Sequence, residues 1–293
     1  MFDRILFPTD GSDGAAAAFD HTLELARSHD ATVYVLNVAN TSRDSVTQIR
    51  GDVIDTLERE GETIVQEAAE RASARDVPTV TEVLQGEPYS TIVDYAPAND
   101  IDLIVMPTHG RRGLERFLLG STTERVVRRS EVPVLTIRPD DGVSVRYPYR
   151  SVLVPTDGSD PASAALDLAV GVVTAGESDL HLLSVVDVAS LGVDVRADIA
   201  VDSLEESARE VLEAAERTAT AAGVDPAATR VEFGTAIARV VRDYVDDNDV
   251  DLIVVGTHGR TGFDRYVLGS VTEMLIRTAT VPVLTVRDES PES

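Results

Sequence analysis

The chain of 293 residues carries one domain pattern twice. The first of the recurring segments is identical in both halves and is offset by 147 residues, from Asp10 to Asp157. Matches at the start, middle and end of each half indicate duplication of a whole domain, because the period is far too long for a solenoid unit. The matching segments are Pro8–Asp13 with Pro155–Asp160, Asn99–Val105 with Asn248–Val254, and Val132–Arg138 with Val281–Arg287.

The boundary between the two copies is expected near residue 140. A chain of this length exceeds what one compact core usually occupies. The stretch from Pro139 to Tyr149 holds Asp, Gly and Pro residues, which suit a linker. We therefore predict one domain over residues 1–140, a linker over 141–148 and a second domain over 149–293.

Each half alternates short apolar runs with helical patterns. Runs such as Ile5–Phe7 and Val152–Val154 are typical of buried parallel strands. Ser12 and Ser159 are expected to cap the helices that follow them, and Pro161 suits a first helical turn. Strict alternation predicts an α/β fold with a doubly wound parallel sheet covered by helices on both faces. In the first half the further strands are expected at Thr32–Val38 and Val80–Leu84, in a segment that ends at Met106, and at Val134–Ile137. In the second half they are expected at Asp179–Val185 and Arg230–Phe233, in a segment that ends at Val255, and at Val283–Val286.

Charge and composition exclude several classes of function. The net charge is −25 and every one of the 26 basic residues is Arg, so nucleic acid and anionic membranes should be repelled. A lysine-free acidic surface is typical of proteins from a high-salt, halophilic cytoplasm, and a drifted acidic composition is the alternative. The absence of cysteine excludes disulfides and thiolate metal sites. No apolar run reaches the length of a membrane span and no leader precedes Ile5, so we expect a cytoplasmic protein.

A glycine pattern near the end of each half points to phosphate. In the second half Gly256 and Gly259 are followed, after nine residues, by Gly269-Ser270. Glycine lets backbone approach a phosphate and adopt dihedrals closed to other residues. Ser270 is expected to open a helix whose N–H groups attract phosphate, with Glu273 at capping-box spacing, and Arg260 could add donors. The alternative is that these glycines only form turns and that Ser270 only caps the helix. The complete pattern favours nucleotide binding.

The other polar candidates lie after the first and fourth strands. Ligands of such sheets bind beyond the carboxyl ends of the strands where the strand order reverses, which would bring Asp157 beside the glycine loop. Asp10 and Asp157 suit ribose hydroxyls, metal ligation or a structural turn, and one carboxylate per site is too few for metal-dependent hydrolysis. His109 and His258 have no evident nucleophile or carboxylate partner, which favours a role in loop packing over catalysis. Neither a P-loop lysine nor the dinucleotide glycine spacing is present.

These residues resemble the universal stress protein family, as two fused copies spanning nearly the whole chain. The resemblance rests on Pro155-Thr156-Asp157-Gly158-Ser159, the glycine pattern with Val271-Thr272-Glu273, and the closing Val281–Leu284. It implies five strands ordered 3-2-1-4-5 in each half, and halves that pair through their last strands as family homodimers do, with a further homodimer also open. The resemblance implies that the chain binds ATP, with AMP or ADP as alternative ligands, and that Mg²⁺ either accompanies the nucleotide or is absent. Adenine would lie near Val185, ribose near Asp157, and phosphates along Gly256, Gly259, Gly269 and Ser270.

The early copy departs from the family pattern at its first glycine. The matching residues are Val38, Asp10, Gly110, Gly120 and Ser121, but Pro107 stands where Gly256 stands in the second half. Proline has no N–H and a fixed φ, so the early site should be impaired. We expect an ATP- or AMP-binding stress-response or regulatory protein, with no catalytic residue and no resident metal. The alternatives are a slow ATPase or nucleotide-transfer enzyme, which the kinship with adenine-nucleotide α-hydrolase folds leaves open, and a first half that serves as a scaffold.

Overall fold

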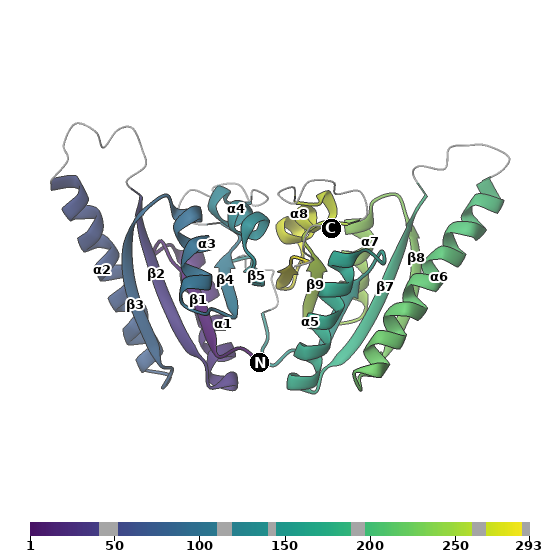
Figure 1. The fold of residues 1–293 in the computed structure, drawn as a ribbon, viewed down its shortest axis with the longest axis horizontal. Helices are drawn as coiled ribbons and strands as arrows, with labels where there is room; N and C mark the ends of the chain where they lie inside the picture. Colours follow the sequence, from purple (N-terminus) through teal and green to yellow (C-terminus); the bar gives the residue numbers. More distant parts are fainter. Residues whose placement is uncertain (41–51, 110–118, 140–144, 189–196, 260–267, 289–293) are drawn as a thin grey trace. The chain divides into compact units, whose positions relative to one another are not determined.

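The computed structural model describes residues 1–40, 52–109, 119–139, 145–188, 197–259 and 268–288. The chain divides into two compact units, Met1–Pro148 (unit 1) and Tyr149–Ser293 (unit 2). Each unit repeats one alternation of strands and helices (Figure 1). The two units are therefore described one at a time.

Unit 1 begins with a strand and ends with a strand. Its third helix contains Pro97 near its end, where the chain turns into the next strand. The elements in chain order are β1 (Arg4–Pro8), α1 (Asp13–His29), β2 (Thr32–Asn40), α2 (Asp52–Ser73), β3 (Thr79–Gly86), α3 (Pro88–Ala98), β4 (Leu103–Pro107), α4 (Ser121–Arg129) and β5 (Val134–Ile137).

Unit 2 repeats the same order with helices and strands of similar length. Its elements are β6 (Ser151–Pro155), α5 (Asp160–Gly176), β7 (Asp179–Asp187), α6 (Ala197–Ala221), β8 (Ala228–Gly234), α7 (Ile237–Asp247), β9 (Leu252–Gly256), α8 (Ser270–Thr278) and β10 (Val283–Val286). Each strand expected from the sequence is found within two residues at either end. The fourth strands run one residue further than expected, so Pro107 and Gly256 are strand residues.

The sheet of unit 1 has the order β3-β2-β1-β4-β5, and every described neighbour pair in it is parallel. In unit 2 the order β8-β7-β6-β9-β10 has the same parallel pairing. The central strands β4 and β9 are buried along their whole length. The strands β3 and β8 contain only exposed and half-buried residues. The predicted doubly wound α/β fold and its strand order are confirmed.

Helices cover both faces of each sheet. In unit 2, α5 packs against α6, and α7 packs against α8. In unit 1, α3 packs against α4 in the same way. The core between α1 and the sheet includes the rings of Phe7 and Phe19, whose centroids lie 4.8 Å apart. Both rings are almost wholly removed from solvent, which stabilises the contact between β1 and α1.

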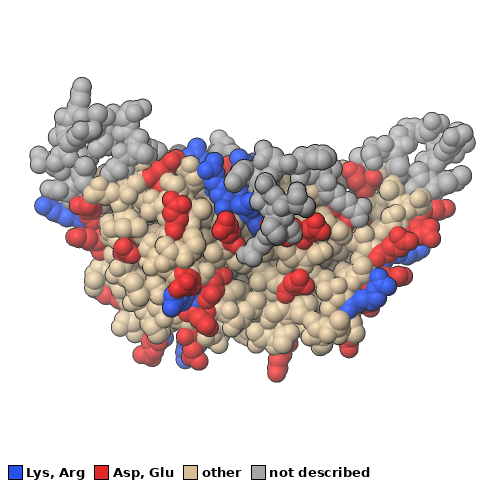
Figure 2. Space-filling model, in the orientation of Figure 1, with Lys and Arg blue, Asp and Glu red and all other residues tan. Residues whose placement is uncertain are grey.

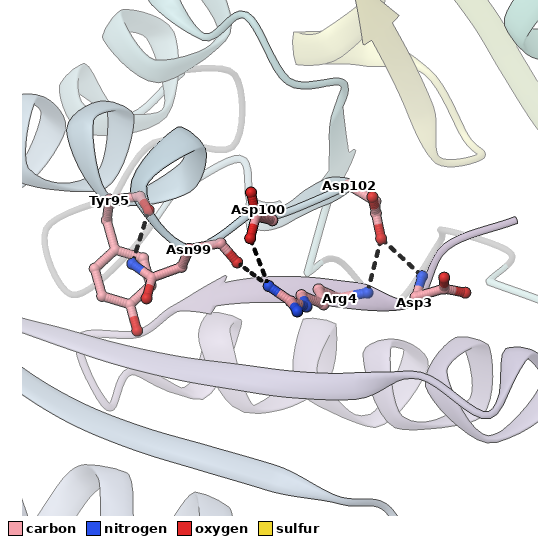
Figure 3. A network of polar contacts seen from close by, with 6 residues as sticks. All are labelled: Asp3, Arg4, Tyr95, Asn99, Asp100 and Asp102. Carbon is pink, nitrogen blue, oxygen red and sulfur yellow. Dashed lines mark hydrogen bonds and ion pairs between the residues drawn. The ribbon is translucent and has the colours of Figure 1, made fainter.

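A polar network fixes the start of β1 to the turn before β4 (Figure 3). The Asp102 carboxylate accepts the backbone N–H groups of Asp3 at 2.8 Å and Arg4 at 2.9 Å. The Arg4 guanidinium donates to the carbonyl of Asn99 at 2.9 Å and to Asp100 at 3.0 Å. Charge-assisted bonds of this kind to backbone donors set the register of β1 against β4. The network lies at the amino-terminal edge of the central strands.

The same edge in unit 2 keeps the essential part of this network. Asp251 accepts the backbone N–H of Arg150 at 2.9 Å, and the Asp251 N–H donates to the Ser151 carbonyl at 2.9 Å. Asp251 is buried, although charged side chains seldom are without partners. Each unit therefore uses one aspartate at the start of its fourth strand to align the first strand.

Acidic side chains are scattered over the visible face of the molecule (Figure 2). Figure 2 shows acidic side chains spread over many elements, with fewer basic ones between them. Several basic side chains are held in ion pairs along helices, such as Arg128 with Glu124 and Arg277 with Glu273. Among the helices that the structure describes, none has the length and apolar character to cross a membrane.

Candidate functional site

The candidate site lies at the carboxyl ends of β6 and β9 in unit 2, and of β1 and β4 in unit 1. These strands are neighbours, and the chain leaves them for opposite sides of the sheet. The β6–β9 ladder pairs Val152 with Leu252 and Leu153 with Ile253, before either strand ends. Beyond this ladder the two loops diverge, as ligand crevices of open α/β sheets do.

The turn after β6 is built by its own polar side chains. Asp157 Oδ1 accepts the N–H of Ser159 at 3.0 Å, and Gly158 between them has a φ of 76°, which glycine adopts without strain. Ser159 Oγ then accepts the N–H of Ala162 at 3.4 Å and caps α5. The predicted serine cap is confirmed. One oxygen of Asp157 thus has a structural role in the turn.

Unit 1 forms the same turn with the same bonds. Asp10 Oδ1 accepts the N–H of Ser12 at 3.0 Å, Gly11 has a φ of 73°, and Ser12 Oγ accepts from Ala15 at 3.2 Å. The two aspartates differ in burial, because Asp10 is exposed and Asp157 is half-buried. The turn itself therefore does not distinguish the two units, but its surroundings do.

The glycines after β9 serve close approach. A Cβ placed on Gly256 would lie 2.7 Å from the backbone of Pro161, and one on Gly259 would lie 2.7 Å from Asp157 Oδ2. One on Gly269 would lie 3.3 Å from the Cα of His258. None of these three is among the positive-φ glycines of the described residues. The expectation that they adopt dihedrals closed to other residues is wrong. Backbone atoms leave no room for a Cβ at Gly256, whereas at Gly259 the nearest atom is the end of a side chain and at Gly269 the approach is only tight.

The start of α8 differs from the capping box expected from Ser270 and Glu273. Gly269 is the N-cap, with φ −62° and ψ 140°, and no side chain caps the helix. Ser270 is instead the first helical residue, and it is exposed. The Glu273 side chain turns away to Arg277, at 3.2 Å. The capping-box prediction is wrong, because an extended glycine before Ser270 takes the cap position.

The absence of a side-chain cap leaves backbone donors at the start of α8. The Gly269 N–H donates to the Thr257 carbonyl at 2.8 Å, so this donor is used within the loop. The N–H groups of Ser270, Val271 and Thr272 precede the first intrahelical bond, from Glu273 to the Gly269 carbonyl at 2.9 Å. They have no acceptor among the described residues. Together with the helix dipole, they form a group that can bind an anion.

Thr272 also latches the helix to the strand. Its Oγ1 donates to the Gly256 carbonyl at 2.8 Å, and both groups are buried. Unit 1 has the equivalent bond from Thr123 Oγ1 to the Pro107 carbonyl at 2.9 Å. From the sequence, Thr272 is expected only to bind ligand. The recurrence of threonine three residues after each Gly120 or Gly269 is the signal that could have revealed the latch.

The start of α4 in unit 1 repeats the start of α8. Gly120 is the N-cap with φ −61° and ψ 135°, without a side-chain cap, and Ser121 opens the helix. The Gly120 N–H donates to the Thr108 carbonyl at 2.7 Å. As in unit 2, the expected serine capping box is replaced by a glycine cap. Both units therefore carry the same helix end at this point.

The two histidines are bonded within their loops. His258 Nδ1 lies 3.2 Å from Thr257 Oγ1, and His109 Nδ1 lies 3.2 Å from Thr108 Oγ1. Both threonines are buried. These bonds orient each imidazole along its own loop, as a packing role requires.

The remaining residues predicted for the site lie on β6 and β7 or their counterparts. Pro155 ends β6 and is half-buried, whereas Thr156 is buried and its N–H donates to the Leu183 carbonyl at 2.8 Å. Val185 is half-buried in β7, two residues beyond that carbonyl, as Val38 is in β2. Both valines therefore lie past the end of the first strand of their unit. Gly110 and Arg260 fall outside the described residues.

Comparison with known proteins gives a consistent result. The model of the universal stress protein family matches residues 1–138 and again residues 148–287. A universal stress protein of Methanocaldococcus jannaschii, MJ0531, is 36% identical over 141 residues, covering 47% of this chain and 83% of that protein. YxiE of Bacillus subtilis is 30% identical over 148 residues, covering 47% of this chain and all of that protein.

A solved structure has the same architecture over nearly the whole chain. A universal stress protein of Archaeoglobus fulgidus is 25% identical and superposes with a TM-score of 0.74, covering 97% of this chain and 98% of its own. A Pseudomonas aeruginosa protein, PA1789, superposes with a TM-score of 0.69 at 15% identity and shows the fold alone. The fold and the tandem organisation thus recur together.

Proposed function

Because the chain belongs to the universal stress protein family, with the family's domain in each half, we propose that it binds an adenine nucleotide in stress response or regulation. The principal site is in unit 2. The observation that carries the proposal is the uncapped start of α8, where the N–H groups of Ser270, Val271 and Thr272 have no acceptor among the described residues. Phosphate is one of the anions that such a helix start binds.

The phosphate and ribose parts of the site are linked by one loop. Gly259 contacts Asp157, while Gly269 packs on His258 and bonds to Thr257. The loop after β9 therefore bridges the carboxylate and the start of α8. A nucleotide with its phosphates at Ser270 and its ribose hydroxyls at Asp157 would cross this loop, with the glycines allowing close approach.

The adenine would lie toward β7, near Val185. This half-buried apolar residue lies beyond the end of β6 and offers a surface to one face of a base. Val38 occupies the same place in unit 1. The proposal therefore gives ATP, AMP or ADP one orientation, with the base at β7 and the phosphates at α8.

Isothermal titration calorimetry with ATP tests the proposal, with AMP and GTP for comparison and with and without Mg²⁺. The change is Asp157→Asn, which keeps an oxygen for the Ser159 N–H but removes the charge offered to ribose. Its matched control is Asp10→Asn in unit 1. We expect one ATP per chain in the parent, a clear loss of affinity in Asp157→Asn and little change in Asp10→Asn.

Two results would overturn the proposal or redirect it. Protein that is purified free of nucleotide and gives no heat with any of the three ligands is not a nucleotide-binding protein. Phosphate release above background that disappears in Asp157→Asn would make it an enzyme. Equal effects of the two aspartate changes would contradict the assignment of the principal site to unit 2.

A further inference from the structure

Proline and glycine exchange places between the two units at two equivalent positions, one early in the first helix and one at the end of the fourth strand. The second residue of α1 is Gly14 and that of α5 is Pro161, each two residues after its capping serine. The last residue of β4 is Pro107 and that of β9 is Gly256. The fourth strands are equivalent in register, because a threonine hydroxyl donates to the carbonyl of each end residue.

In unit 2 the proline lies in helix α5, as Pro161, and the glycine lies at the end of strand β9, as Gly256. A Cβ on Gly256 would lie 2.7 Å from the carbonyl carbon, the carbonyl oxygen and the Cβ of Pro161. Two of these three atoms are backbone, so no side-chain rotation could relieve the overlap. Pro161 itself is buried and suits the first helical turn, where its missing N–H is not needed. Helix α5 can therefore occupy its position only with glycine at the end of β9.

In unit 1 the glycine lies in helix α1, as Gly14, and the proline lies at the end of strand β4, as Pro107. A Cβ on Gly14 would lie 3.0 Å from the carbonyl oxygen of His109 and 3.0 Å from Cγ of Pro139. Pro107 brings a ring to the end of β4, and Pro139 follows β5. The counterpart of Pro139 in unit 2 is Asp288. Unit 1 thus has two prolines at or just after the ends of β4 and β5 and none in the first turn of α1. Unit 2 has a proline in the first turn of α5 and none at the corresponding positions of β9 and β10.

The exchange acts on the aspartate turn, because that turn leads directly into the helix. Asp157 precedes the capping serine of α5 by two residues, and Pro161 follows it by two. Helix α5 packs more extensively on β9 than α1 packs on β4. The same difference appears at the carboxylates, since Asp157 is half-buried against Gly259 and Asp10 is exposed.

We propose that Pro161 and Gly256 are a matched pair that positions the Asp157 turn for nucleotide binding. In unit 1 the corresponding set is Gly14, Pro107 and Pro139, and it keeps the Asp10 turn out of the position that nucleotide binding requires. Pro161 and Gly256 are positioning residues, acting through Asp157. The inference rests on the proposed function. It differs from the simpler account in which unit 1 is impaired only by the N–H group that Pro107 lacks.

Binding measurements on three variants separate the two accounts. All carry Asp157→Asn, so that the signal comes from unit 1. Pro107→Ala restores the N–H but keeps a Cβ at the end of β4, and Pro107→Gly restores the N–H and removes that Cβ. The triple change Gly14→Pro, Pro107→Gly, Pro139→Asp installs the residues that unit 2 has at these three positions. We expect ATP affinity in unit 1 to rise at least tenfold in the triple variant and to stay near the parent value in Pro107→Ala.

A control without ligand tests the matching itself. Unfolding by urea is compared among four proteins: the parent, the helix-side change Gly14→Pro, the sheet-side change Pro107→Gly with Pro139→Asp, and all three together. We expect each side alone to lower the midpoint and the combination to recover most of the loss, because only the combination restores a filled contact. Additive losses would overturn the pairing.

The outcomes keep the two proposals apart. Absence of ATP binding in the parent would overturn the proposed function, while the unfolding comparison would still decide whether the residues are matched. Full binding in Pro107→Ala would overturn the inference and leave the nucleotide site intact as a proposal. A triple variant that recovers stability without gaining affinity would show that the pair packs the helix but does not position the turn for nucleotide.

Discussion

The carboxylate of Asp157 lies against Gly259 so closely that a Cβ on residue 259 would be 2.7 Å from Asp157 Oδ2. Asp157 Oδ1 is meanwhile held by the N–H of Ser159. One oxygen thus fixes the turn and the other faces the glycine loop. This contact makes the position of the second oxygen depend on the absence of a side chain at residue 259.

Gly259→Ala should weaken ATP binding more than it weakens the fold. The added methyl group meets only the end of the Asp157 side chain, which can rotate away, whereas ribose would lose a charged acceptor. Such a bond contributes about 1.5–3 kcal/mol, so affinity should fall roughly tenfold to a hundredfold. Calorimetry measures the affinity and thermal unfolding measures the fold.

Gly256→Ala is the matched comparison for that change. Its methyl group meets backbone atoms of Pro161, so its main effect should be a lower unfolding temperature. If Gly259→Ala destabilises the protein as much as Gly256→Ala does, the contact with Asp157 is not the flexible one described. Unchanged affinity in Gly259→Ala would show that Asp157 does not face the nucleotide.

Thr272→Val should destabilise unit 2. The change removes the hydroxyl that donates to the buried Gly256 carbonyl at 2.8 Å. An unsatisfied buried group of this kind costs about 1–3 kcal/mol. Urea unfolding monitored by circular dichroism gives the difference in free energy.

Thr272→Ser retains a hydroxyl and serves as the control. It should recover most of the stability, with a smaller loss from the missing methyl group. Thr123→Val applies the same test to the Pro107 carbonyl in unit 1. Equal stability of the valine and serine variants would mean that the latch contributes nothing.

The stability of unit 1 should fall as the pH falls from about 6.5 to about 4. Burial lowers the pKa of His21 from its ordinary value of 6.5 to about 4. The unfolded chain therefore binds a proton in this window that the folded chain resists, and the folded state loses up to about 3 kcal/mol. Above pH 6.5 both states are neutral and this contribution no longer changes. Unfolding free energies measured at half-unit steps of pH test the sign.

His21→Phe should flatten that pH profile. The ring is retained, including its edge contact with Tyr147 at 6.0 Å between centroids, but the titrating group is removed. His29 adds a change of the same sign, because burial lowers its pKa too. A profile as steep in His21→Phe as in the parent would remove His21 from the explanation.

Salt should stabilise the protein at neutral pH. A net charge of −25 on one chain repels itself at low ionic strength. Because the screening length falls to about 3 Å at 1 M, the unfolding temperature should rise with KCl and level off near that concentration. Differential scanning calorimetry across a KCl series measures the rise.

Potassium sulfate at equal ionic strength separates screening from solute exclusion. Screening predicts equal effects of the two salts, whereas exclusion of sulfate from the surface predicts a larger effect of sulfate. An unfolding temperature that does not change with KCl would contradict the electrostatic explanation and remove the support for a high-salt origin.

The sequence predicts the fold well because the fold depends on periodic apolar runs. Buried strands such as Val283–Val286 appear in full, and Ser12 and Ser159 cap their helices as expected. Strand ends are less well predicted, because β4 and β9 each extend one residue further than expected. The added residues are Pro107 and Gly256, whose carbonyls accept the hydroxyl groups of Thr123 and Thr272. The pairing of the two halves through their last strands stays a prediction.

The site is less predictable because its glycines act on residues distant in sequence. Gly256 meets Pro161 and Gly259 meets Asp157, and neither contact has a local signature. The expected serine cap at Ser270 failed for a similar reason: the geometry of the preceding Gly269, set by the loop beneath it, decides where the helix begins. The sequence locates such a site, but the reason for each glycine needs the neighbouring atoms.

Asp102 and Asp251 have the same role in the two units, at the edge of the sheet opposite the glycine loops. Alignment of the first and fourth strands therefore does not depend on the residues at the opposite edge. Unit 1 carries Pro107 where unit 2 carries Gly256, and both sheets have the same strand order. If unit 2 binds nucleotide as proposed, the separation of these two edges lets the loops of one unit change while both sheets keep the same strand alignment.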